Sequence, residues 1–287
     1  GFIVPNNRGT MYFTSARDVE LQIVADDDVV RLFAQAVRVP PNGGGEPAQD
    51  AVECGAAASR NGAIDFSPRY IFTLPAGEGP YFVLLCLYDA AGNASEAFEY
   101  KTYTLDLSAP FEAEILVNNG RDMTNNTELN VVVSADDSVT EVEAVKLSQN
   151  DSCTGGAWEP YAPGGSGQMR RRFEVAGGDN RERSISAVFR NSAGLESACV
   201  SDTVIVDTEG PRVASVSARA SNGNTERTGS QAIQLLLTYE AAGSPCDEVQ
   251  ISEDSSFAER DEITEVDTCA DDPVDFTLSE ENGNKTI

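Results

Sequence analysis

One strand pattern recurs along this chain at a spacing of roughly one hundred residues, and it restricts the fold more than any other feature. The segment that begins at Leu21 (LQIVADDD) returns at Leu129 (LNVVVSADD) and again at Ile233 (IQLLLTYE). The junction LDLSAP, which ends at Pro110, returns as VDTEGP, which ends at Pro211. A period of this length predicts a string of small domains rather than one large core. We place the domain boundaries at 1–105, 106–206 and 207–287.

Strands are the regular elements that the sequence predicts. Val19, Leu21 and Ile23 alternate with polar residues, as a half-buried strand requires, and apolar residues recur with the same spacing of two in 129–133 and 233–237. A longer apolar run, 81–88, ends at a turn that contains Gly92, and its counterpart at 185–189 ends at a turn that contains Gly194. No segment shows a sustained helical period. About seven short strands per hundred residues are typical of an immunoglobulin-like sandwich, so the predicted fold is all-β, with tandem immunoglobulin-like β-sandwich domains.

The junctions between the repeats are short and contain proline. Strands predicted at 101–105 and 204–206 run directly into 106–110 and 207–211, without a flexible Gly/Ser spacer. The domains are therefore expected to form a semi-rigid rod.

The two ends of the chain differ from the middle repeat in what they contain. The first repeat starts at Phe2 and lacks the Asp-x-x-x-Pro leader that opens the second repeat at 106–110. The third repeat stops at Ile287, about two strands short of the sandwich pattern. We expect the chain to be a window on a longer array. Strand donation by another chain, which would build a filament, is the alternative.

Charge and composition exclude several classes of function. The net charge is −27, with 47 acidic and 20 basic side chains, so nucleic acid and anionic lipid are poor partners. Histidine is absent, which excludes catalytic triads with histidine and zinc sites with histidine ligands. No apolar run is long enough to span a membrane, and no phosphate-binding or nucleophile motif occurs. We therefore predict that this stretch of chain is not an enzyme.

The six cysteines fall two to a repeat, which predicts three disulfides within the repeats. Six cysteines allow fifteen connectivities, and pairing within each repeat is the simplest. Their spacing does not fit zinc. Three disulfides indicate an oxidising compartment, hence secretion or the cell surface. The predicted pairs are Cys54 with Cys86, Cys153 with Cys199, and Cys246 with Cys269.

These junctions, strands and turns resemble those of a known family. The Asp-x-Ser/Thr-x-x-Pro junction, the Val-x-Leu-x-Ile-x-Ala-x-Asp strand, the Trp158–Tyr161 segment and the Asp89–Ser95 turn look like tandem bacterial Ig-like repeats. Such repeats occur in large secreted or surface proteins and adhesins, which implies an extracellular location. The second turn departs from the pattern, because Asn191 stands where the first repeat has an acid.

Acidic clusters at the predicted domain ends are candidate calcium ligands. In a sandwich the B–C and F–G loops share one end, so the acidic cluster at 26–28 could approach Asp89 and Asn93 there. The linker residue Asp106 could likewise approach the second acidic cluster, at 136–137. Carboxylate and carbonyl oxygens are the ligands of calcium, although Asp also suits such turns by accepting bonds from backbone amides. The two clusters are Asp26, Asp27 and Asp28, and Asp136 and Asp137.

Trp158 and Tyr161 are the aromatic pair that could stack on a sugar ring, although core packing is the alternative. We therefore predict a non-catalytic structural or adhesive segment, a stalk or fibre of Ig-like domains on a bacterial surface. Its expected partners are neighbouring repeats of the same or another chain, and a surface glycan or protein. A carbohydrate- or protein-binding module and a strand-exchanging filament subunit are the alternatives.

Overall fold

The structure is a computed structural model, and it describes most of the chain. The described residues are 2–3, 11–40, 46–48, 51–95, 99–176, 181–220, 222–240, 246–253, 256, 264–266, 273–280 and 283.

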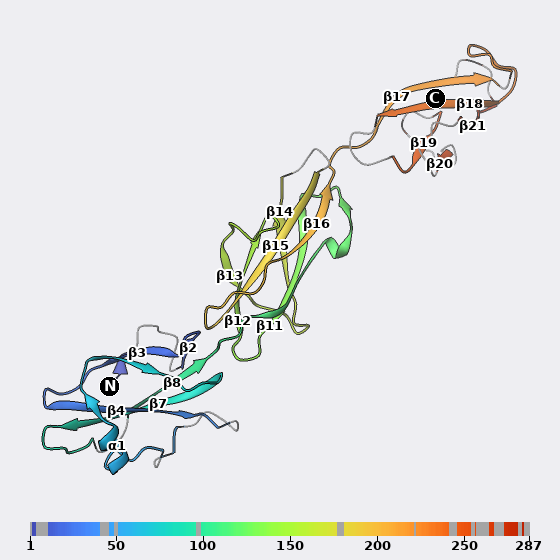
Figure 1. Ribbon diagram of the computed structural model, residues 1–287. Helices are drawn as coiled ribbons and strands as arrows, with labels where there is room; N and C mark the ends of the chain where they lie inside the picture. Colours follow the sequence, from blue (N-terminus) through green and yellow to red (C-terminus); the bar gives the residue numbers. More distant parts are fainter. Residues whose placement is uncertain are drawn as a thin grey trace. The chain divides into compact units, whose positions relative to one another are not determined.

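Almost every regular element in these residues is a strand, as the alternation predicted (Figure 1). The strands up to the first junction are β1 (Phe2–Ile3), β2 (Met11–Thr14), β3 (Asp18–Ile23), β4 (Val29–Arg38), β5 (Ile64–Asp65), β6 (Arg69–Thr73), β7 (Gly79–Asp89) and β8 (Glu99–Leu105). Those up to the second junction are β9 (Phe111–Val117), β10 (Met123–Thr124), β11 (Glu128–Asp136), β12 (Val142–Ser148), β13 (Trp158–Pro160), β14 (Met169–Glu174), β15 (Arg181–Asn191) and β16 (Val200–Val206). The remaining strands are β17 (Arg212–Ala220), β18 (Ala232–Glu240), β19 (Val249–Ile251), β20 (Thr264–Val266) and β21 (Val274–Thr277).

The strand order repeats from one stretch of chain to the next. The first stretch forms the sheets β1-β3-β6 and β2-β8-β7-β4-β5, and the second forms β14-β11-β9 and β10-β16-β15-β12-β13. Corresponding strands therefore occupy corresponding places, and we call these pairs of sheets the first and second sandwich. The third stretch forms β17-β18-β21 and β19-β20. The fold is all-β and built from β-sandwiches, which confirms the predicted class.

Two compact units can be distinguished, and each is described by itself. Unit 1 comprises Gly1–Leu116, Val132–Arg171 and Ile185–Asp202, and unit 2 comprises Val117–Val131, Arg172–Ser184 and Thr203–Ile287. The domain boundaries at 1–105, 106–206 and 207–287 stay a prediction.

The core of the first sandwich lies between its two sheets. Alternate residues of β3, Val19, Leu21 and Ile23, are buried and pack against residues of β7 and β8 such as Val83 and Leu105. This is the arrangement that a period of two requires, because successive side chains point to opposite faces of a sheet.

Strand β7 is buried on both faces, which explains why its sequence is an unbroken apolar run. Phe82, Leu84 and Cys86 belong to a second cluster, on the face away from the main core. That face is covered in part by the segment that carries Cys54, which is bonded to Cys86. The predicted disulfide is therefore present, and it joins a covering segment to the sheet.

A short helix, α1 (Ala57–Gly62), lies in this covering segment, although the sequence predicted strands alone. Ser59 is the buried residue among its six, and no side chain caps its first turn. Because a helix of under two turns has too few residues to show a helical period, the pattern could not reveal it.

The second sandwich also carries a disulfide, but it joins two loops rather than a covering segment and a strand. In unit 1, β12 pairs with β13 on one side and with β15 on the other. The loop between β12 and β13 holds Cys153, which is bonded to Cys199 just before β16, again as predicted. Glycines at the two turns, Gly92 and Gly194, have φ of +84° and +88°, the left-handed region expected for such turns.

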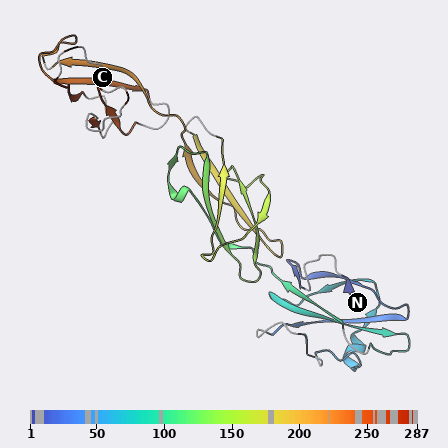
Figure 2. The same cartoon turned by 180° about the vertical axis from the view of Figure 1, so that it is seen from behind.

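In unit 2, β18 is the central strand of its sheet and pairs with β17 and β21 (Figure 2 gives the reverse view). Ile233, Leu235 and Leu237 form its buried face, as the third copy of the repeat predicted. Cys246 is also disulfide-bonded, and its predicted partner Cys269 lies outside the described residues.

Candidate functional site

The best-defined polar site of unit 1 surrounds the carboxylate of Asp106, the first residue after β8. The residue is fully buried, with 0% of its surface exposed. Its Oδ2 accepts hydrogen bonds from Thr140 Oγ1 at 2.6 Å and from Asn191 Nδ2 at 2.9 Å, and its Oδ1 accepts one from the backbone N–H of Ser108 at 3.0 Å. A buried carboxylate is tolerated only when donors replace the water that it loses, and here three donors do so.

Asn191, the last residue of β15, connects this carboxylate to its surroundings. Its Nδ2 lies 2.9 Å from Asp106 Oδ2, 3.0 Å from the carbonyl oxygen of Ser108 and 3.1 Å from Asp137 Oδ2. Its Oδ1 accepts a bond from the backbone N–H of Leu195 at 2.9 Å, which closes the turn after β15. One neutral amide group thus donates to two carboxylates and fixes its own turn, and the side chain is 1% exposed overall.

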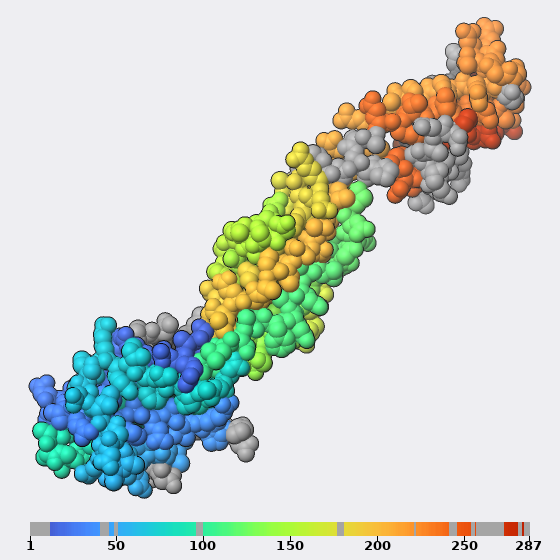
Figure 3. Space-filling model, viewed as in Figure 1, coloured from blue at the N-terminus to red at the C-terminus, as the bar shows by residue number. Residues whose placement is uncertain are grey.

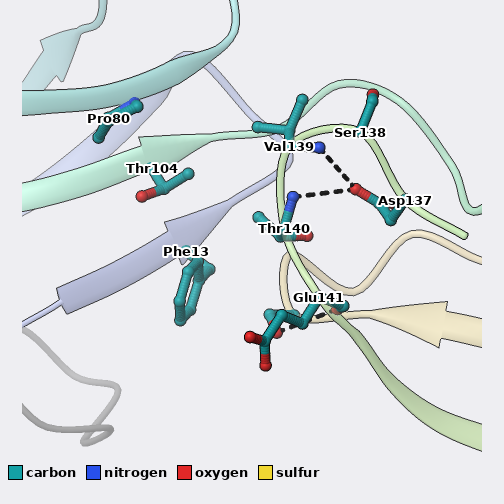
Figure 4. Close-up of a pocket in the computed structure, with 9 residues that line it drawn as sticks. Phe13, Pro80, Thr104, Asp137, Ser138, Val139, Thr140 and Glu141 are labelled. Atoms are coloured by element: carbon teal, nitrogen blue, oxygen red, sulfur yellow. Dashed lines mark hydrogen bonds between the residues drawn. The ribbon is translucent and has the colours of Figure 1, made fainter. Parts of the chain in front are cut away.

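Asp137 shapes the loop that supplies Thr140. Its Oδ1 accepts hydrogen bonds from the backbone N–H groups of Val139 at 3.0 Å and Thr140 at 2.9 Å (Figure 4). Such bonds from an aspartate to amides two and three residues later fix a tight turn. The turn in turn places the Thr140 hydroxyl where it reaches Asp106.

The next linker residues are bound by the first sandwich. Glu78, in the loop before β7, accepts hydrogen bonds at Oε1 from the backbone N–H of Leu107 and from the Ser108 hydroxyl, both at 2.7 Å. The linker residues 106–108 are therefore bonded on one side by the first sandwich and on the other by the loop 137–140 and the β15 turn.

Burial raises the pKa of the Asp106 carboxyl, and the negative charges of Asp137 and Glu78 act in the same direction. The bonds from Thr140 and Ser108 oppose this rise. In the turn after β7, the side chain and then the backbone of Asn93 lower the pKa of Asp89. Asn93 donates from its backbone N–H to Asp89 Oδ1 at 2.8 Å and from Nδ2 to Oδ2 at 2.7 Å.

The structure places the predicted calcium ligands in two groups. Asp26, Asp27 and Asp28 are exposed in the turn before β4, at the end of the sheet where Val29 pairs with Asp89. In the second group Asp106 and Asp137 meet through Asn191, whereas Asp136 is exposed. Among the residues that the structure describes, no three carboxylates or thiols are grouped so that they could hold a metal ion. Calcium binding stays a prediction.

A cavity of about 500 Å³ lies beside this linker in unit 1 (Figure 4). Phe13, Pro80 and Thr104 line it together with the loop 137–141 and Ser192. Both oxygens of Asp137 are already bonded to Val139, Thr140 and Asn191. The loop residues of the cavity thus serve the linker site.

The predicted aromatic pair is split between the two faces of one sheet. The Tyr161 ring contacts the buried ring of Phe189 at 5.4 Å between centroids, whereas Trp158 lies under the cations of Lys146 and Arg190. Because Phe189 and Arg190 are successive residues of a strand, their side chains point to opposite faces. Trp158 and Tyr161 therefore do not form one platform, and ligand binding by either residue stays a prediction.

Sequence reasoning missed three residues of the linker site: Glu78, Thr140 and Asn191. Asn191 did carry a signal, because it occupies the turn position that is acidic in the first repeat. Its amide group supplies donors that a carboxylate at this position would lack. Glu78 and Thr140 carried no such signal, since each meets the linker only through the tertiary fold.

Comparison with solved structures gives matches of low sequence identity. No family model matches the chain, and no curated protein matches it. Among solved structures, the fibronectin(III)-like modules of Clostridium thermocellum CbhA match with a TM-score of 0.42 and 12% identity, over 72% of this chain and 93% of that one. The D00-D0 domain of intimin matches with a TM-score of 0.25 and 13% identity, over 71% and 98%. A putative membrane-anchored protein from Corynebacterium diphtheriae matches with a TM-score of 0.27 and 10% identity, over 87% and 64%. At these TM-scores the matches carry no functional information. In the described residues, no helix has the length and apolar character needed to cross a membrane.

Proposed function

We propose that this chain is a non-catalytic extracellular spacer, a segment of three immunoglobulin-like domains whose first junction holds its domains in one orientation. The observation that carries the proposal is the linker 106–108, which is hydrogen-bonded from both sides. Glu78 of the first sandwich binds Leu107 and Ser108, while Asn191 and Thr140 of the second bind Asp106.

This arrangement resists bending for a physical reason. Rotation about the linker would separate a buried carboxylate from its donors, and an unsatisfied buried charge costs several times more than an exposed hydrogen bond contributes. A flexible spacer would instead expose its linker to water, where broken bonds are replaced at little cost.

Two further features support an extracellular structural role. The disulfides Cys54–Cys86 and Cys153–Cys199 each attach a covering segment or loop to a sandwich, and structural disulfides are typical of oxidising compartments. The net charge of −27 would keep neighbouring copies apart and in solution.

Residual dipolar couplings measured on the whole chain test this proposal. If the junction is stiff, couplings from residues 11–95 and from residues 132–171 fit a single alignment tensor. The double substitution Glu78→Ala with Asn191→Ala should give two tensors of unequal magnitude, because the bonds from Glu78 and Asn191 to the linker are lost and only Thr140 of the second sandwich still binds Asp106. Ser192→Ala, which lies in the same turn and bonds Glu141 rather than the linker, is the matched control. Two unequal tensors in the unmodified chain would overturn the proposal.

A further inference from the structure

The outer face of the second sandwich carries a cationic site around the sole tryptophan, apart from the linker. Trp158 of β13 pairs with Lys146 of β12, and Ala144 of β12 pairs with Arg190 of β15. Val145 and Phe189, which point to the other face, are both fully buried. Trp158, Lys146 and Arg190 therefore share the face directed away from the core. Strand β13 and its flanking loops lie at the surface of the molecule, coloured yellow-green in Figure 3.

Both cations lie over the indole ring. Lys146 Nζ is 5.0 Å from the ring centroid, and Arg190 Cζ is 4.4 Å from it. Within the part of the chain that the structure describes, neither side chain forms a salt bridge, although Glu196 lies opposite Arg190 across an antiparallel bridge, and the indole N–H donates no hydrogen bond to the protein. Two other arginines of this sandwich, Arg171 and Arg172, are paired with Glu159 and Glu128. The cluster thus presents three kinds of unused donor: a guanidinium, an ammonium and an indole N–H.

The cluster shares its face of the sheet with two buried apolar residues. Ala144 and Val188 are 6% and 5% exposed although they lie on the outer face, so larger side chains cover them. In the strand registers, Arg190 lies opposite Ala144 and Lys146 lies opposite Val188. A ligand that binds here would meet charged donors and the edge of an aromatic ring together.

From this juxtaposition we propose that Trp158, Lys146 and Arg190 form a binding site for a saccharide that carries a carboxylate. The planar fork of an arginine matches a carboxylate, a lysine adds a mobile positive charge, and the indole contributes a donor and an aromatic edge against which a sugar ring can lie. The site goes beyond the spacer role and does not depend on it.

Two observations favour a sugar acid over other anionic partners. Strand β13 is a sheet edge of three residues that ends in Pro160, which has no N–H to donate, so this edge cannot extend its ladder to an acidic peptide there. The net charge of −27 repels polyanions such as nucleic acids or heavily sulfated chains at long range. A ligand with an isolated carboxylate largely avoids that repulsion and still satisfies both cations.

Because Trp158 is the sole tryptophan, one indole N–H signal in a ¹H–¹⁵N NMR spectrum reports directly on the site. We would titrate the whole chain with the methyl glycosides of glucuronic, galacturonic and N-acetylneuraminic acids. Methyl glucoside serves as the neutral match, and sodium acetate as an anion without a sugar ring. At least one sugar acid should shift the signal saturably, and about tenfold more tightly than methyl glucoside or acetate.

Substitutions then assign the binding to the cluster. Arg190→Gln should weaken binding by about tenfold or more, and Lys146→Gln by a smaller factor, because a point charge gives less directional recognition than a guanidinium. Arg170→Gln removes the same charge from an exposed position outside the cluster and should leave binding unchanged.

The proposal is overturned if none of the three sugar acids shifts the signal, if acetate or methyl glucoside binds as tightly, or if Arg190→Gln has no effect. Alignment tensors at the linker would be unchanged by any of these results, so failure here is distinguishable from failure of the spacer role.

Discussion

At the scale of single residues, the first junction depends on a buried polar group, the carboxylate of Asp106, rather than on an apolar contact. Asp106 loses its water entirely, and its two oxygens recover three hydrogen bonds from Thr140, Asn191 and Ser108. Removing one partner of such a buried group leaves the other unsatisfied, which makes these bonds hard to break separately. A carboxylate with fixed donors has directional partners, whereas an apolar side chain could slide.

The raised pKa of Asp106 predicts an unusual dependence of stability on pH. Because the folded chain binds this proton more tightly than the unfolded chain, the contribution of Asp106 is fully present below the unfolded pKa, near 3.8, and is lost as pH rises through the higher folded pKa. The free energy of unfolding of the unmodified chain, minus that of Asp106→Asn, should therefore increase as pH falls from 7 toward 4. The carboxyls that act on it, Asp137 and Glu78, are present in both proteins.

Urea unfolding followed by Trp158 fluorescence measures this difference, since the sole tryptophan lies in the sandwich that binds Asp106. The slope cannot exceed about 1.4 kcal/mol per pH unit for one proton. A difference that stayed constant, or that decreased toward acid pH, would show that the donors outweigh burial and that the folded pKa is not raised.

At the scale of elements, the loop between β12 and β13 depends on one close approach to the sheet. Gly156 has φ of +74°, and a Cβ atom at this position would lie 2.2 Å from the backbone oxygen of Leu147. The same loop holds Cys153 and leads into Trp158. Gly156→Ala should therefore lower the free energy of unfolding by about 2 kcal/mol or more, because left-handed strain and a backbone clash add together.

Gly155 provides a matched control for this substitution. Its φ is +80°, but a Cβ atom there would meet nothing within 4 Å. Gly155→Ala should cost only the strain of the left-handed conformation, about 1 kcal/mol. Equal losses for the two variants, measured by urea unfolding, would show that the loop shifts to relieve the clash.

The elements also show which parts of the structure local sequence could predict. The alternation in β3 comes from burial on one face, so period and burial agree. In β11 and β18 the agreement is partial, because Val132 is buried between Val131 and Val133 and the apolar Leu236 is exposed. Strand β7 was recognisable by its unbroken apolar run, but the segment that covers its outer face, with α1 and Cys54, leaves no periodic signal. The linker site was predicted in part: Asp106 and Asp137 do approach one another, through an amide donor that the acidic pattern did not reveal. The contact of Glu78 with Ser108 joins residues that are 30 positions apart and meet only in the folded chain, so local sequence patterns do not predict it.

At the scale of the whole molecule, net charge is a property that follows directly from the sequence. A net charge of −27 on 287 residues produces a field that extends about a Debye length into solution, roughly 30 Å at 0.01 M salt and about 8 Å at physiological ionic strength. Copies displayed side by side would therefore repel one another at low salt far beyond contact distance. The cationic cluster at Trp158 would attract an anion in spite of this field only if the anion is small enough to contact the cluster directly.

Small-angle X-ray scattering over a concentration series tests this repulsion. At 0.01 M salt the forward scattering per unit mass should fall as concentration rises, because repelling particles space themselves out, and the fall should nearly vanish at 0.5 M salt. Lowering the pH toward the sequence pI of about 4.1 supplies the control, since the charge is then removed without added salt. Scattering that rose with concentration at 0.01 M salt would mean that copies attract in spite of their charge. An interaction surface would then have to be strong enough to overcome the field, and a self-assembling subunit would account for the molecule better than a spacer.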